Sequence, residues 1–227
     1  MTTKLLQFVN IKKEMPKKRG SSLRLKDFNE IYNDFNKLEG KKQAGRCSQC
    51  GIPFCQVHCP LQNNIPDWLK LAAENRLEEA YEVSHSTNNF PEICGSICPQ
   101  DRLCEGNCVI EKGFESVTIG RVEKHITDTA WKKGWIKPLN PPKEIDKSIG
   151  IIGSGPAGLA AAEELRKKGY KIEVYDRYDR PGGLLIYGIP NFKLEKYAVE
   201  RRTQILKKGL SLIHISEPTR RYAISYA

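Results

Sequence analysis

Apolar side chains recur at helical spacing three times in the first part of the chain. Leu25–Leu38 carries one such stripe. A second helix is predicted to begin at Pro66, because proline suits the first turn of a helix. A third is predicted at Ile119–Ala130 and is closed by Gly134. Met1–Gly20 is polar and basic and is expected to lie extended along the surface.

The period changes after Lys137–Lys147, a connector rich in proline and charge. Ser148–Ile152 is a short apolar run that suits a buried parallel strand, and Lys171–Tyr175 alternates as a second strand. Between them, Ala157–Lys168 has the spacing of a helix with alanines on its packing face. A further helix is predicted at Leu194–Lys208. The pattern indicates one βαβ unit followed by a helix.

These patterns predict two domains, a linker and a separate tail. A small α-helical domain occupies residues 1–136, and residues 137–147 form the linker. Residues 148–209 are predicted to be the first βαβ part of a Rossmann-like α/β domain. Residues 210–227 match the translation of a transposase-type sequencing adapter followed by an index read, so we expect a non-native tail from adapter read-through. A genuine amphipathic strand is the alternative.

The composition excludes several classes of protein. The chain is 39% hydrophobic and 28% charged, which is typical of soluble globular proteins. No apolar run approaches the roughly 18 residues of a membrane span, and no signal peptide is visible. The net charge is 37 − 27 = +10, but the basic patch near the N-terminus lacks the interleaved aromatic residues of a nucleic-acid surface. The members of that patch are Lys12, Lys13, Lys17, Lys18 and Arg19. We expect a cytoplasmic protein that binds neither nucleic acid nor membrane.

All eight cysteines lie in the predicted helical domain, in two runs of four. The first run is Cys47-x2-Cys50-x4-Cys55-x3-Cys59, and the second is Cys94-x3-Cys98-x5-Cys104-x3-Cys108. A [4Fe–4S] cluster takes four soft thiolate ligands, so two sets of four cysteines predict two such clusters. A disulfide framework would need a secreted context, which the sequence does not indicate.

A structural zinc site is the alternative to iron and sulfur. Zinc sites usually pair two CxxC motifs, and only Cys47–Cys50 has that spacing here. His58 lies inside the first run and is expected to be a hydrogen-bonding neighbour, because eight thiolates are available. In two-cluster ferredoxins the last cysteine of a run ligates the other cluster. The same exchange would form the sets Cys47, Cys50, Cys55, Cys108 and Cys59, Cys94, Cys98, Cys104, but spacing alone leaves the assignment open.

Gly153-Ser154-Gly155-Pro156-Ala157-Gly158 lies between a predicted strand and a predicted helix, the context of a dinucleotide-binding loop. The first glycine permits a tight turn, the second lets the backbone approach a pyrophosphate, and the third lets the helix pack on the strand. Asp176 follows after 176 − 153 = 23 residues, where an acidic residue binds ribose hydroxyls. The loop does not separate FAD from NAD(P). Arg180–Leu185 favours FAD, because it is similar to the second glycine pair of flavoproteins that bind two dinucleotides.

Together these features resemble the small (β) subunit of NAD(P)H-dependent glutamate synthase. The resemblance rests on Pro16–Arg19, both cysteine runs, Gly153–Gly158 and Gly182–Lys193, and it covers nearly the whole chain to Gly209. The same architecture recurs in the electron-entry module of dihydropyrimidine dehydrogenase and in related ferredoxin–NADP reductases. A related module with another electron acceptor is therefore the alternative.

The resemblance implies an oxidoreductase subunit. In that family NAD(P)H reduces FAD, and single electrons pass through two [4Fe–4S] clusters to a large (α) subunit that makes glutamate from glutamine and 2-oxoglutarate. By position, Gly153–Gly158 would hold the FAD pyrophosphate and Asp176 its ribose. Gly183, Leu184 and Lys193 would line the rest of the FAD. No catalytic residue is assigned.

The chain departs from the family in its second half. A full member has a second GxGxxG loop for NAD(P)H and later strands that complete the flavin site, and neither is present here. We therefore expect the chain alone to be incomplete and not to oxidise NADPH. Two competing hypotheses from other classes are an electron-transfer module that is not itself an enzyme and a zinc-stapled interaction domain.

Overall fold

The computed structural model describes residues 6–209 and 212–215, which form two compact units. The first unit holds the residues up to Ile136 together with Phe192–Leu194. The second holds Lys137–Asn191 and the residues from Glu195 onward. The change of unit after Ile136 falls at the residue where the proline-rich connector begins.

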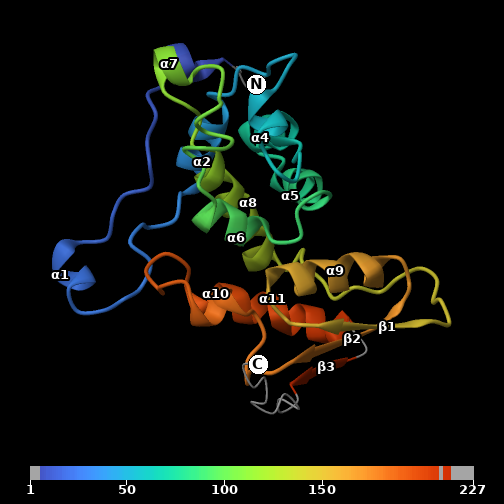
Figure 1. Cartoon of the computed structure of the whole chain (residues 1–227). Helices are drawn as coiled ribbons and strands as arrows, with labels where there is room; N and C mark the ends of the chain where they lie inside the picture. The colour runs from blue at the N-terminus through green and yellow to red at the C-terminus, as the bar shows by residue number, and fades with distance from the viewer. Residues whose placement is uncertain (1–5, 210–211, 216–227) are drawn as a thin grey trace, which may run out of the picture. The chain divides into compact units, whose positions relative to one another are not determined.

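The first unit is built from short helices (Figure 1). In chain order they are η1 (Gln7–Val9), α1 (Ser21–Arg24), α2 (Lys37–Ala44), α3 (Phe54–Val57), α4 (Ile65–Ala73), α5 (Leu77–His85), α6 (Pro91–Ile97), α7 (Glu111–Phe114) and α8 (Ile119–Lys133). The core forms around α8, which packs against α2, α4, α5 and α6. Val122, Ile126 and Ala130 on its inner face are fully buried, so the predicted apolar stripe is confirmed. Gly134 closes α8 with a φ of 71°, as predicted.

The helix predicted at Leu25–Leu38 is wrong. The chain is not helical between α1 and α2, and Leu25 and Phe28 are 88% and 78% exposed. The backbone of residues 31–33 instead pairs with that of residues 17–19, through hydrogen bonds from the Arg19 and Asn33 amides. The apolar spacing in this stretch therefore does not mark a buried helical face.

A capping box at Asn36 starts α2. The Asn36 side chain accepts hydrogen bonds from the amides of Leu38 and Glu39, both at 2.9 Å, and the Glu39 carboxylate accepts one from the Asn36 amide at 2.9 Å. This reciprocal pattern satisfies amides that the first turn leaves without partners. The helix then continues to Ala44 and leads the chain to the first cysteine.

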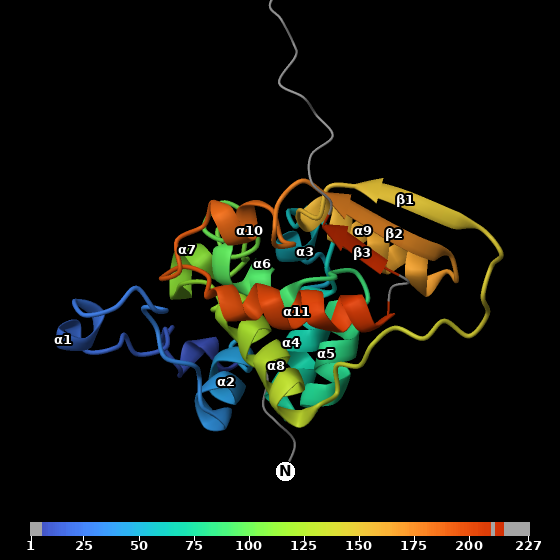
Figure 2. The same cartoon turned by 90° about the horizontal axis from the view of Figure 1, so that it is seen from below.

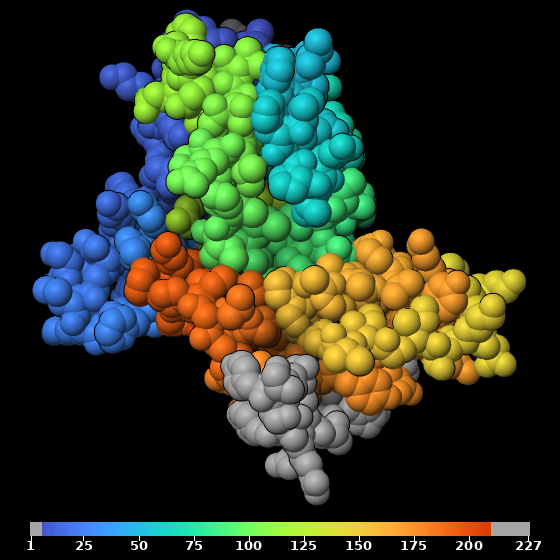
Figure 3. All heavy atoms as spheres, viewed as in Figure 1, coloured from blue at the N-terminus to red at the C-terminus, as the bar shows by residue number. Residues whose placement is uncertain are grey.

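Between η1 and α1 the N-terminal segment is mostly exposed and without a helix, as expected, and side-chain contacts tie it to the first unit. The rings of Phe8 and Phe114 have centroids 4.9 Å apart. Lys13, a member of the basic patch, donates to Glu105 at 3.1 Å and to the Ser116 hydroxyl at 2.7 Å. The space-filling view shows the blue N-terminal atoms beside the yellow-green segment of α7 (Figure 3).

The second unit contains a three-stranded parallel sheet in the order β1-β2-β3. Its elements are β1 (Ser148–Ile152), α9 (Pro156–Lys167), β2 (Lys171–Asp176), α10 (Leu184–Tyr187), α11 (Lys196–Gly209) and β3 (Leu212–Ile215). Ser148 pairs with Lys171, and Glu173 pairs with Leu212. α9 packs against β1 and β2, on one face of the sheet (Figure 2). The predicted βαβ unit is confirmed.

β1 is not buried as its apolar run predicts: Ile152 is 94% exposed, because β1 has only β2 beside it in the described sheet. Leu212–Ile215, inside the predicted tail, forms a strand, which is the alternative structure considered for it. Residues 210–211 and 216–227 lie outside the described residues, and the origin of the tail stays a prediction.

Candidate functional site

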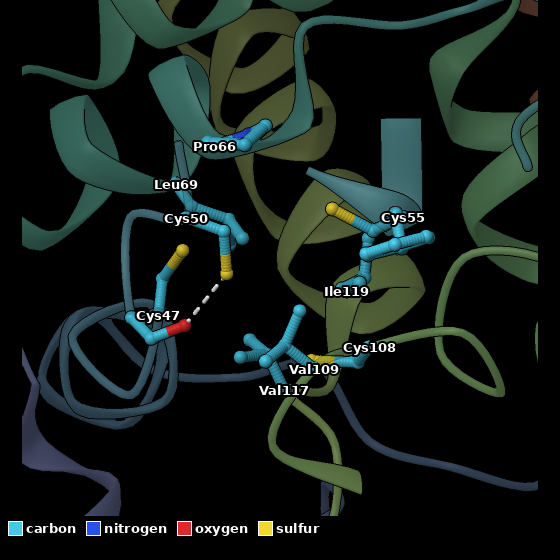
Figure 4. A pocket seen from close by; sticks show the side chains of 11 residues that line it. Cys47, Cys50, Cys55, Pro66, Leu69, Cys108, Val109, Val117 and Ile119 are labelled. Atoms are coloured by element: carbon cyan, nitrogen blue, oxygen red, sulfur yellow. Dashed lines mark hydrogen bonds between the residues drawn. The ribbon is translucent and has the colours of Figure 1, made fainter. Parts of the chain in front are cut away.

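Four thiols from both cysteine runs line one cavity of the first unit. Cys47, Cys50 and Cys55 come from the first run, and Cys108 comes from the end of the second. In the close-up these four cysteines surround the cavity (Figure 4). The apolar part of its wall is formed by Phe54, Pro66, Leu69, Val109, Val117 and Ile119. We call this set of cysteines the first thiol group.

The loop between α2 and α3 supplies hydrogen bonds to this group. The Ser48 hydroxyl lies 3.0 Å from the Cys50 sulfur. The Gln49 side-chain amide donates to the Cys47 sulfur at 3.2 Å and to the Pro66 carbonyl at 2.8 Å. Gln49 itself has a φ of 52°, so the loop turns sharply at this residue. Hydrogen bonds to ligating sulfurs are one of the means by which a protein adjusts a metal cluster.

The remaining four cysteines, Cys59, Cys94, Cys98 and Cys104, are called the second thiol group, and the structure links them in pairs. Cys94 lies in α6 and is hydrogen-bonded to Cys98, which follows the helix. Cys104 and Cys59 are close enough for their charges to interact. Cys108 thus lies with three thiols of the first run, and Cys59 lies near Cys104 of the second run, an arrangement compatible with the ferredoxin-like exchange.

Burial dominates the electrostatics of the thiols. It raises the pKa of Cys47 and Cys104, and it raises the pKa of Cys55 to about 12. In the second group, the hydrogen bond between the two thiols raises the pKa of Cys94 and lowers that of Cys98 to about 7. Metal ligands must be thiolates, so metal binding at these groups releases protons.

Sequence reasoning missed Glu123, which faces the second thiol group. Burial raises the pKa of its carboxyl group to about 8, with a contribution from the charge of Cys98, and the Glu123 charge acts on Cys94 and Cys104. The Asn88 side chain donates to it at 3.0 Å. Its position on the inner face of α8 was visible in the helical pattern, but its neighbours were not.

His58 and the arrangement of the thiols bear on the zinc alternative. His58 is exposed, and its Nδ1 atom is hydrogen-bonded to the Phe54 carbonyl at 2.9 Å. Within residues 6–209 and 212–215, no three histidine, cysteine or acidic side chains converge on a position for a single metal ion. The first thiol group lines the wall of a cavity instead, an arrangement that fits a cubane with four iron corners.

The glycine loop of the second unit follows β1 and opens α9. Gly153 has a φ of 102°, a conformation that favours glycine. A Cβ atom on Gly158 would lie 1.9 Å from the Gly153 carbonyl oxygen, so the helix and the turn can approach only without a side chain there. A Cβ atom on Gly155 would meet nothing within 4 Å. Pro156 and Ala157 form the exposed first turn of α9.

Asp176 at the end of β2 braces this loop. One carboxylate oxygen accepts from the amide and the hydroxyl of Ser154, each at 2.5 Å, and the other accepts from the Tyr178 amide at 2.9 Å. Partial burial by itself would raise the pKa of Asp176, but these hydrogen bonds outweigh it and lower that pKa. Ser154 is fully buried, so the Asp176 carboxylate is held against the loop.

The second glycine pair touches the same loop. The Gly182 amide donates to the Ser154 carbonyl at 2.8 Å, and a Cβ atom on Gly183 would lie 2.9 Å from Cα of Gly155. Leu184 is 72% exposed. Lys193 is exposed and belongs to the three-residue segment counted with the first unit.

Lys196, which the sequence did not single out, helps to hold the segment after the second glycine pair. Its ammonium group donates to the carbonyls of Leu185, at 3.0 Å, and Ile189.

Two family models match the chain in the predicted order. Residues 24–135 match dihydropyrimidine dehydrogenase domain II, 4Fe-4S cluster, and residues 151–215 match the NAD(P)-binding Rossmann-like domain. The predicted fold class, an iron–sulfur domain followed by the start of a Rossmann-like domain, is confirmed.

The glutamate synthase [NADPH] small chain of Azospirillum brasilense is 64% identical over 212 residues, which are 93% of this chain and 44% of that relative. The resemblance to the glutamate synthase small chains is confirmed. The small chain of Escherichia coli K12 is 47% identical over 205 residues, covering 90% of this chain and 43% of the relative. The small chain of Bacillus subtilis 168 is 43% identical over 220 residues, covering 92% of this chain and 44% of the relative. The chain therefore spans less than half the length of these small chains.

The match to the structure of the amine oxidase HisD of Pseudomonas geniculata N1 covers 68% of this chain and 21% of that one, at 22% identity and a TM-score of 0.33. In the part of the chain that the structure describes, no helix is long and apolar enough to cross a membrane.

Proposed function

We propose that this chain carries the electron-entry part of a glutamate synthase. Reducing equivalents from NAD(P)H would pass by way of FAD and two [4Fe–4S] clusters to a large (α) subunit, which makes glutamate from glutamine and 2-oxoglutarate. The observation that carries the proposal is that Cys108 of the second run lies with Cys47, Cys50 and Cys55 around one cavity, while Cys59 of the first run lies near Cys104. The matched relatives are named glutamate synthase [NADPH] small chain, and the substrates and the electron path come from the resemblance.

The residues around the thiols fit iron–sulfur clusters. When bound, such a cluster accepts and releases one electron. The first thiol group would hold one cluster through Cys47, Cys50, Cys55 and Cys108, and the second group would hold the other through Cys59, Cys94, Cys98 and Cys104. Gln49 donates to the Cys47 sulfur, Ser48 is hydrogen-bonded to the Cys50 sulfur, and the apolar wall of the cavity would limit the access of water.

The glycine loop fits the pyrophosphate of a dinucleotide, for which we propose FAD. Gly155 leaves open space at the N-terminal end of α9, where backbone amides and the helix dipole favour phosphate. Asp176 would keep the loop in place and accept a hydrogen bond from the ribose, because a carboxylate has about four lone-pair sites. Gly183, Leu184 and Lys193 are proposed, from the resemblance, to contact the rest of the FAD.

A related module that delivers electrons to another acceptor is the second candidate. The family model that matches residues 24–135 favours this candidate, because its description names dihydropyrimidine dehydrogenase. The two candidates share the clusters and the dinucleotide loop and differ in the partner.

Cysteine-to-serine variants of the full chain, prepared without oxygen and reduced with dithionite, test the two thiol groups. We expect Cys108→Ser to remove the same electron paramagnetic resonance signal as Cys50→Ser, and Cys59→Ser to remove the same signal as Cys104→Ser. His58→Ala is the matched control and keeps both signals, because His58 is exposed and bonds only to a backbone carbonyl. The grouping would be contradicted if Cys108→Ser and Cys104→Ser removed the same signal.

The reaction is tested in the complete small chain bound to its large subunit. NADPH-dependent formation of glutamate from glutamine and 2-oxoglutarate is expected, and it should be lost in Cys108→Ser and Cys59→Ser. A complex that reduces a pyrimidine and forms no glutamate would favour the second candidate.

A further inference from the structure

Arg46 is a fully buried cation that has no carboxylate partner among the described residues. Its guanidinium donates only to backbone carbonyls. The acceptors are those of Ile11 at 2.9 Å, Ser116 at 2.5 Å, Phe114 at 2.6 Å and Glu115 at 2.9 Å. Carbonyl dipoles satisfy its hydrogen bonds, but they do not supply the negative charge that a buried cation requires.

This cation lies beside the first thiol group. Arg46 directly precedes Cys47 in the chain, and three of its acceptors belong to the segment 114–116, soon after Cys108. Its charge interacts with that of Cys108. The nearest carboxylates, those of Glu111 and Glu115, act on it only through their charge and belong to exposed residues.

Unlike Arg46, Lys13 and Arg121 of the first unit are paired with carboxylates. Lys13 donates to Glu105 at 3.1 Å, and Arg121 lies 3.4 Å from a carboxylate oxygen of Glu30. The buried charges that act on thiols of the second group belong to the carboxyls of Glu123 and Glu105, not to a cation. The two thiol groups therefore differ in the charge of the buried side chain next to them.

We propose that Arg46 is the counter-charge of a cluster at the first thiol group and raises its reduction potential above that of the cluster at the second group. The proposal rests on the proposed function, since it requires clusters at both groups. A cluster with four thiolate ligands is negative, and reduction adds one electron and no bond. A buried positive charge therefore stabilises the reduced form more than the oxidised form. An electron shared by the two sites would accordingly favour the first thiol group.

Potentiometric titration of the full chain, followed by electron paramagnetic resonance, tests this role. Arg46→Gln should lower the potential of one cluster by about 59 mV, which is a tenfold change in its reduction equilibrium, and should leave the other in place. The affected signal should be the one that Cys108→Ser removes. Arg46→Lys keeps the charge and should leave both potentials unchanged, although it loses hydrogen bonds. Arg76→Gln is the matched control, because it removes the same charge from an exposed arginine paired with Glu74 and Glu79.

A second variant covers the case in which Arg46→Gln does not fold. Glu115 is exposed, and its negative charge opposes that of Arg46. Glu115→Gln should therefore raise the potential of the same cluster, which corresponds to an increase of its reduction equilibrium constant by about twofold to threefold. The proposal is overturned if these charge changes move neither potential, if they move both equally, or if the first group has the lower potential in the unaltered chain. Absence of both cluster signals from the unaltered chain would instead refute the proposed function.

Discussion

Gly155 and Gly158 are three residues apart in the same loop but are glycines for different reasons. A Cβ atom at Gly158 would collide with the Gly153 carbonyl at 1.9 Å, whereas one at Gly155 would point into open space. Gly158→Ala is therefore expected to lower the free energy of unfolding by about 1–3 kcal/mol. Gly155→Ala should change it by less than about 0.5 kcal/mol and should weaken FAD binding. Denaturant unfolding and flavin fluorescence measure the two effects, and equal destabilisation by both variants would contradict this account.

Asp176 gives the second unit a predictable dependence on pH. Burial by itself would raise the pKa of this carboxyl group. Hydrogen bonds from Ser154 and Tyr178 outweigh burial and lower the pKa below its ordinary value. Its contribution to stability is present above the unfolded pKa of about 4 and is lost as the pH falls through the lower folded pKa. Asp176→Asn should therefore be less stable than the unaltered chain at pH 7, by a margin that narrows below pH 4. Unfolding at both pH values tests this, and a margin that widens in acid would contradict it.

At the scale of elements, α2 depends on its N-terminal cap. Asn36→Ala removes the acceptor for two amides and should lower the stability of the first unit by about 0.5–2 kcal/mol. Asn33→Ala is the control, because Asn33 is exposed and lies outside the helix. Denaturant unfolding of both variants makes the comparison. A loss of stability in Asn33→Ala as large as that in Asn36→Ala would show that the cap does not set the start of α2.

The elements that the sequence predicted are those whose pattern and ends agree. α8 combines a buried apolar stripe with Gly134, and the β1–α9–β2 unit combines strand patterns with the glycine loop. The helix predicted at Leu25–Leu38 is wrong because Leu25, Phe28 and Leu38 are exposed and the helix begins at the Asn36 cap instead. Local spacing cannot show which surface a stripe meets.

The sequence predicted the cysteines and the glycine loop of the candidate site, but not the side chains that surround them. The cysteines and the glycine loop carry their chemistry in short motifs, so they can be found in the sequence. Arg46 could not be found in this way, because its acceptors at 114–116 are about 70 positions away and make no pattern with it. The same holds for Glu123 and the thiols of the second group.

At the scale of the whole molecule, all eight cysteines belong to the first unit, so metal removal should affect the two units differently. Each proposed cluster joins the segment 47–59 to the segment 94–108. Removal of iron by a chelator is expected to lower the melting temperature of the first unit by about 5 °C or more and to leave the second unit nearly unchanged. Hydrogen exchange on heating, followed peptide by peptide, separates the units. Equal loss of protection in both would contradict the assignment of the metal to the thiol groups.

The most direct test of the central claim is the iron and acid-labile sulfide content of the full chain, purified without oxygen. Two [4Fe–4S] clusters predict about eight atoms of iron and about eight of sulfide per chain, since each cubane holds four of each. About four of each would mean that only one thiol group binds a cluster. Zinc without sulfide would contradict the account and establish the zinc-stapled domain in its place.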